Sequence, residues 1–131
     1  MISLDTSVVL RYLVGSPPEQ ARRATAVMDR EEQLGISIVA IVETAHVLRT
    51  QYGVDRAEIV AVLIDLVTRD NVTTLGLPTP EVLEALVRCR SLPGSPIPDA
   101  LIAAAARSEG ALPVYTFDLA FGRHGVPVVS P

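Results

Sequence analysis

The chain of 131 residues has a single cysteine, Cys89, which cannot form a disulfide framework or a cysteine-based zinc site. No apolar run approaches the roughly 18 uninterrupted residues that a membrane span needs. The N-terminus lacks the basic segment that opens a signal peptide. These absences predict a reducing, cytoplasmic environment without a membrane partner. The length suits one domain, which we expect to cover residues 1–131.

Lysine is absent, so all 11 basic residues are arginine. A two-component receiver domain and a Walker-type phosphate loop both need a lysine, and the sequence argues against both classes. A haloacid-dehalogenase-type phosphatase would also need a second aspartate two residues after Asp5, where this chain has Ser7.

The net charge is −4, which argues against a protein that simply coats nucleic acid. Apolar residues make up 49% of the chain, which is rich for a domain of this length. We therefore expect part of the apolar surface to face another chain, as a dimer or partner interface.

Hydrophobic periodicity and turn residues predict strands that alternate with helices. The expected strands span residues 1–4, 35–38, 72–75, 113–117 and 126–129. The expected helices span residues 7–14, 19–33, 39–52, 56–68, 79–90 and 99–109, with a loop over residues 90–98. This order predicts an α/β fold: a three-layer α/β/α sandwich with a short, mainly parallel sheet of four to five strands.

Four carboxylates stand in apolar surroundings, where a charge is expensive. They are Asp5, Glu43, Asp99 and Asp118. Asp5 and Asp118 follow the C-terminal ends of expected strands. Glu43 lies about one helical turn after a strand, and Asp99 opens the helix that leads into another. Because ligands of parallel sheets bind at the carboxyl ends of the strands, we expect all four acids on one rim.

Carboxylates gathered in this way need a cation. Two like charges about 5 Å apart repel by roughly 3 kcal/mol at an effective dielectric constant near 20. Carboxylate oxygens prefer hard ions, so the pattern predicts Mg²⁺ or Mn²⁺ rather than zinc. One or two such ions could support hydrolysis of a phosphodiester.

Each acid also has a structural alternative. Asp99 can be a helix N-terminal acid that interacts with the helix dipole, and Asp5 and Asp118 can be capping or turn residues. The alternative is weakest for Glu43, because its helix has little polar face. The coincidence of all four on one rim favours a metal site.

Three further residues have modest expected roles. Glu43 and His46 form a Glu-x-x-His pair, but a di-iron bundle needs two such pairs. We expect His46 to pack beside the site or to be exposed, and His124 to be solvated in a turn. Cys89 is expected to be a small apolar residue of a helix.

Four segments resemble the motifs of one known family, in order and over nearly the whole chain. They are I-S-L-D-T-S-V-V-L-R-Y-L at 2–13, I-V-E-T-A-H-V-L at 41–48, P-D-A-L-I-A-A-A-A at 98–106 and V-Y-T-F-D-L-A-F at 114–121. The family is the PIN domain, and the chain resembles specifically the VapC-type toxin ribonucleases of type II toxin–antitoxin systems.

This resemblance implies a metal-dependent endoribonuclease that hydrolyses structured RNA, often transfer or ribosomal RNA, and leaves 5′-phosphate and 3′-hydroxyl ends. It also implies a homodimer that is neutralised by a small antitoxin protein and can join it in a hetero-oligomer.

The resemblance assigns roles to individual residues. The catalytic ligands of Mg²⁺ or Mn²⁺ would be Asp5, Glu43, Asp99 and Asp118. The hydroxyl groups that hold these ligands or phosphate would belong to Thr6, Ser7 and Thr116. Candidates for orienting the RNA backbone are Arg11, Arg88, Arg90, Arg107 and Arg123.

The chain departs from the family pattern at three positions. Ala120 stands where many relatives have another aspartate, which makes a one-metal resting state plausible. Ser7 replaces a frequent asparagine and His46 a frequent aromatic residue, but neither change removes a core ligand. The alternative function is a non-catalytic PIN-fold module that binds RNA or protein. Such a module would be expected to lose acids, and this chain keeps four.

Overall fold

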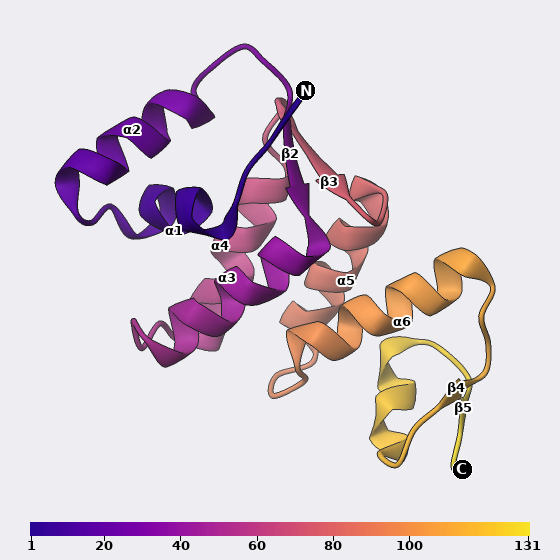
Figure 1. Ribbon diagram of the computed structural model, residues 1–131. Coiled ribbons are helices and arrows are strands. Elements are labelled where there is room, and N and C mark those ends of the chain that lie inside the picture. Colours follow the sequence, from indigo (N-terminus) through magenta and orange to yellow (C-terminus); the bar gives the residue numbers. More distant parts are fainter.

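Parallel strands and flanking helices make up the computed structural model, which describes all residues, 1–131 (Figure 1). In chain order the elements are β1 (Ile2–Ser3), α1 (Thr6–Val14), α2 (Pro18–Met28), β2 (Leu34–Ser37), α3 (Ile38–Thr50), α4 (Arg56–Val67), β3 (Val72–Leu75), α5 (Thr79–Ser91), α6 (Ile97–Glu109), β4 (Val114–Tyr115), the 3₁₀ helix η1 (Leu119–His124) and β5 (Val128–Val129). The predicted α/β class is confirmed.

Capping side chains and a glycine set several helix ends. The Asp5 carboxylate caps α1 by accepting from the backbone N–H of Ser7 at 3.2 Å. The Ser37 hydroxyl caps α3 by accepting from the backbone N–H of Ala40 at 3.1 Å. Gly110 ends α6 with a φ of 68°, a left-handed conformation that suits glycine.

The five strands are all parallel, but they form two separate sheets. The first has the order β1-β2-β3, with Ile2 beside Leu34 and Gly35 beside Thr73. The second pairs β4 with β5, with Val114 beside Val128. The predicted sheet of four to five strands is therefore divided into sheets of three and two.

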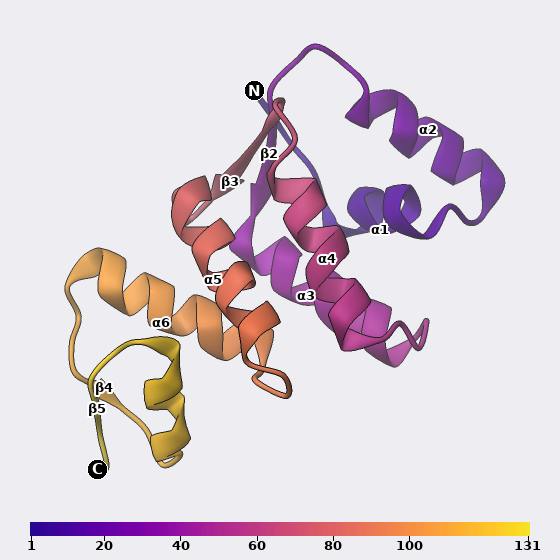
Figure 2. The same ribbon diagram turned by 180° about the vertical axis from the view of Figure 1, so that it is seen from behind.

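The last part of the chain, residues 112–131, forms a C-terminal unit that contains β4, η1 and β5. Figures 1 and 2 show it at the end of α6, which lies between it and the three-stranded sheet. A small core of Ala103 on α6 with Phe121 and Val126 holds the unit to this helix. The unit thus packs on α6 rather than on the edge of β1, and this packing divides the sheet.

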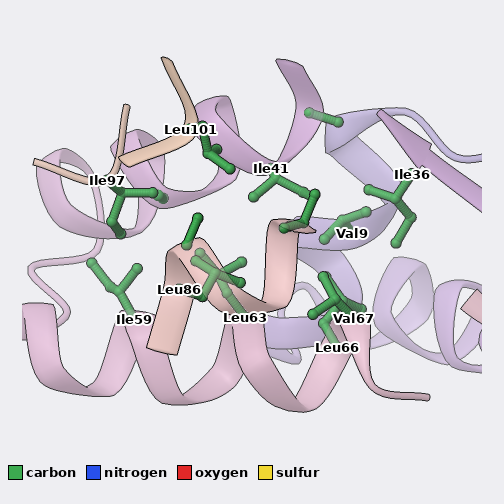
Figure 3. Close-up of a cluster of buried hydrophobic side chains, with 14 of the residues drawn as sticks. Val9, Ile36, Ile41, Ile59, Leu63, Leu66, Val67, Leu86, Ile97 and Leu101 are labelled. Atoms are coloured by element: carbon green, nitrogen blue, oxygen red, sulfur yellow. The ribbon is translucent and has the colours of Figure 1, made fainter. Parts of the chain in front are cut away.

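The main hydrophobic core lies among the sheet and the helices around it (Figure 3). Ile41 of α3, Leu63 of α4 and Leu86 of α5 are fully buried there. Ile97 and Leu101 bring the N-terminal half of α6 into the same core. None of the helices combines the length and the apolar character needed to cross a membrane.

Most element boundaries differ from prediction by one or two residues, and the end of one helix differs by more. Helix α2 ends at Met28 rather than at residue 33, because residues 29–33 are polar and exposed and offer no apolar face. Helix α6 begins at Ile97, two residues early, since a proline fits the first helical turn, where its missing N–H has no partner to lose. The 3₁₀ helix η1 was not predicted.

Candidate functional site

Asp5 lies just beyond β1, where its carboxylate caps α1. The Ser7 hydroxyl donates to this carboxylate at 2.7 Å, in addition to the backbone bond from the same residue. These hydrogen bonds, led by the one from the Ser7 side chain, lower the pKa of Asp5. Asp5 is therefore an exposed, ionised carboxylate at neutral pH, held by the serine expected to support it. Its neighbour Thr6 is buried.

Glu43 lies on α3 at an apolar groove between α3 and α6. The groove has a volume of about 870 Å³. Its apolar lining includes Ile38, Val39 and Val42 from α3, and Leu101, Ile102 and Ala105 from α6. The Glu43 side chain is exposed and makes no hydrogen bond or ion pair within the chain, so its oxygens are available to a ligand.

The face of α3 that carries Glu43 also presents two basic groups. His46 and Arg49 follow Glu43 at three-residue spacing, and both line the groove. Arg49 was not among the arginines proposed from sequence, because nothing in the sequence indicates which face of α3 borders the groove. An exposed guanidinium that lines the same groove as an exposed carboxylate could bind a phosphate next to a cation.

Asp99 lies half-buried in the first turn of α6, on the side of that helix that faces the C-terminal unit. It precedes Ala103 by one turn, and Ala103 packs on Phe121. Burial lowers the pKa of His124, and the nearby Asp99 charge opposes this shift. Burial likewise raises the pKa of the Cys89 thiol, and Asp99 adds to that rise. Asp99 thus acts electrostatically on buried groups of α5 and η1.

Asp118 caps η1 at the end of the C-terminal unit's first strand. Its Oδ1 accepts from the backbone N–H of Ala120 at 3.0 Å. The Thr116 hydroxyl accepts from the Asp118 backbone N–H at 3.0 Å and so fixes the main chain at this acid. Phe117 and Leu119 flank Asp118 and are 90% and 57% exposed, which makes this the most exposed apolar segment of the chain.

The four acids do not meet within one copy of the chain. No group of three or more aspartate, glutamate, histidine or cysteine side chains lies close enough to hold a metal ion. The expected single rim is missing because β4 belongs to a different sheet from β1, so Asp118 does not come to Asp5. The carboxylate oxygens suit Mg²⁺ or Mn²⁺, but their arrangement in one copy does not. Their role as ligands remains a prediction.

The structure shows how exposed the two histidines and the single cysteine are. His124 was predicted to be solvated, and this was wrong: it is 1% exposed, and its Nε2 lies 2.7 Å from the Ser95 hydroxyl. His46 is exposed on the groove, and Cys89 is a fully buried residue of α5, as predicted.

Three of the arginines proposed to contact RNA make hydrogen bonds within the chain. Arg11 donates to the side-chain oxygen of Gln20 at 2.9 Å. Arg107 donates to the backbone carbonyl of His124 at 3.2 Å, and Arg88 donates to Glu84 at 3.4 Å. Arg56, which sequence did not single out, donates to the carbonyls of Ser95 and Leu92 in the loop between α5 and α6.

Comparison with known proteins gives one family. The PIN-domain family model matches residues 2–126. Among solved structures, the chain is similar to Mycobacterium tuberculosis VapC20, described as a Sarcin-Ricin loop cleaving toxin. The two chains share 25% identity over 100% of both, with a TM-score of 0.44. No curated protein matches the chain significantly. The chain belongs to the PIN-domain family.

Proposed function

We propose that this protein is an endoribonuclease that hydrolyses RNA phosphodiesters with the help of Mg²⁺ or Mn²⁺. The observation that carries the proposal is the family match over residues 2–126, which spans all four acids in the order of the family motifs. The proposed ligands are Asp5, Glu43, Asp99 and Asp118. A divalent ion bound by such carboxylates would stabilise charge on the phosphoryl oxygens.

The side chains around the acids support this chemistry. The hydrogen bonds from Ser7 lower the pKa of Asp5, and Thr116 fixes the backbone from which Asp118 projects. A charged ligand held in place by a hydroxyl group needs little reorganisation when a cation binds. Arg49 on the α3 face offers a bidentate contact for an RNA phosphate.

The proposed substrate is structured RNA, transfer or ribosomal, and the proposed partner is a small antitoxin protein that neutralises the enzyme in the cytoplasm. Both follow from the motif resemblance to VapC-type toxins. RNA of this kind is recognised by shape and by phosphate contacts, which suits a protein whose only basic side chains besides histidine are arginines.

Cleavage of total cellular RNA by the purified protein, with Mg²⁺, with Mn²⁺ and with EDTA, tests the proposal. We expect discrete fragments that require metal, and a loss of about 100-fold or more in rate for Asp99→Asn, because that change removes a charge from the reacting site. Asp65→Asn, an exposed acid of α4 outside the set, is the matched control and should cleave normally. Unchanged cleavage by folded Asp99→Asn would contradict the proposal.

A second candidate is a non-catalytic PIN-fold module that binds RNA or protein. The observation that favours it is that no three of the acids meet within a single copy. The same experiment distinguishes the two: a module would retain RNA in a gel-shift assay without cutting it under any metal condition.

A further inference from the structure

Strands β1 and β4 both have an open edge. β1 pairs only with β2, and β4 pairs only with β5, and both pairs are parallel. Each of these strands is two residues long, and Asp5 and Asp118 follow them. An open strand edge carries backbone groups that can pair with another strand. Parallel pairing of β4 with a β1 edge would bring Asp118 beside Asp5.

The C-terminal unit also exposes apolar side chains that nothing in the chain covers. Phe117 is 90% exposed, and Leu119, Tyr115 and Leu112 are each exposed by more than two-fifths. Large apolar residues gathered in one short segment usually mark a contact surface. The unit therefore presents an apolar projection with the carboxylate of Asp118 between two apolar side chains.

An apolar groove that could accept this projection, called the recess below, lies elsewhere on the same molecule. The groove between α3 and α6 begins at Ile38, directly after β2, the strand that pairs with β1. Val39 and Ile102 at this groove are 74% and 53% exposed. Arg49 and Glu43 both lie among its lining residues, so the groove carries one charge of each sign. The projection and the recess are complementary in apolar character.

In the observed arrangement the unit packs on the face of α6 that carries Ala103, whereas Leu101, Ile102 and Ala105 of the same helix line the groove. Figures 1 and 2 show the unit beyond α6 from the three-stranded sheet. One face of α6 fixes the unit through Phe121 and through the bond from Arg107 to the His124 carbonyl. The other face lies in the main core through Ile97 and Leu101. The helix thus separates the projection from the recess of the same chain.

We propose that two copies exchange their C-terminal units. The segment around Phe117 and Leu119 of one copy fills the α3–α6 groove of the other, and β4 pairs in parallel with the other copy's β1. Each site is then shared, with Asp5 and Glu43 from one copy and Asp118 from the second. This proposal rests on the proposed function for the assignment of these acids to one site, and it accounts for the separation of Asp118 from Asp5, which follow strands of two different sheets in one copy. Because each copy makes the same contact with the other, the assembly is a dimer with two-fold symmetry.

Complementation between two inactive variants tests the shared site. Asp5→Asn and Asp118→Asn, coexpressed with different tags and purified together, should place both changes in one site of the mixed dimer and leave the other site intact. A random mixture should then recover about a quarter of the wild-type cleavage rate, because half of the dimers are mixed and each has one intact site. If the tags show that mixed dimers are present and cleavage activity is still not recovered, the exchange is overturned.

A cross-link provides a readout that does not depend on activity. Ser3→Cys and Tyr115→Cys are introduced together, at exposed positions of β1 and β4, and the protein is oxidised. The exchange predicts a covalent dimer on a non-reducing gel, absent from each single variant, and a wild-type mass in solution twice that of one chain. A disulfide within one chain, or none, would overturn it. A cross-linked dimer, together with no RNA cleavage by the wild-type protein, would leave the exchange standing and refute the nuclease.

Discussion

At the scale of single residues, His124 is a buried base with one unsatisfied nitrogen. Its ring packs at 5.4 Å from that of Phe121, its Nε2 contacts Ser95, and its Nδ1 has no partner. Burial lowers its pKa; Asp99 opposes this, and nearby arginines add to it. The sequence suggested a solvated turn because glycines flank this histidine. The anchoring of η1 by Phe121 and Val126 is a tertiary contact that no local pattern reveals.

This histidine should make the fold sensitive to acid. A folded-state pKa below the unfolded value of about 6.5 means that the unfolded chain binds more protons below that pH, so stability falls as the pH drops through this range. Between pH 7.5 and 5.5 we expect the melting temperature of the wild type to fall by about 3 °C more than that of His124→Gln. His46→Gln, at an exposed position, should behave like the wild type. Equal falls in all three proteins, measured by circular dichroism, would contradict this account.

At the scale of elements, the junction of β2 and α3 positions Glu43 without an intervening loop. The strand ends at Ser37 and the helix begins at Ile38, within one residue of the boundary predicted from the sequence. The junction was predictable because a buried apolar strand runs directly into a helical pattern. The six-residue η1 offered no such signal, since it is too short to show a period and depends on the Asp118 cap.

Removing the Ser37 cap should destabilise the junction of β2 and α3. Ser37→Ala loses the hydrogen bond to the Ala40 N–H and should lower the free energy of unfolding by about 1 kcal/mol. Ser37→Thr keeps a capping hydroxyl and should recover most of this loss. Urea unfolding followed by circular dichroism measures both values. A threonine variant as unstable as the alanine variant would show that the hydroxyl does not stabilise α3.

At the scale of the whole molecule, local patterns predicted the strands, their parallel direction and the types of residue at the site. They did not predict the division into two sheets, because strand order depends on pairing between β1 and β4, which lie over 100 residues apart. The high apolar content did indicate a face for another chain, and Phe117 and Val39 are now candidates for that face. The sequence of a single chain does not show which copy of the dimer contributes each acid to a site.

Acids that lie apart in one copy are proposed to serve a single divalent-cation site. Titration of the wild-type protein with Mn²⁺ in a calorimeter, beside Glu43→Gln, Asp118→Asn and the control Asp65→Asn, tests whether they bind one ion together. We predict that the wild type and the control bind Mn²⁺ alike. Each of the other two substitutions should weaken binding by about tenfold or more, since even supporting groups change metal affinity by about that factor. Equal affinities in all four proteins, or no Mn²⁺ binding by the wild type, would contradict the claim.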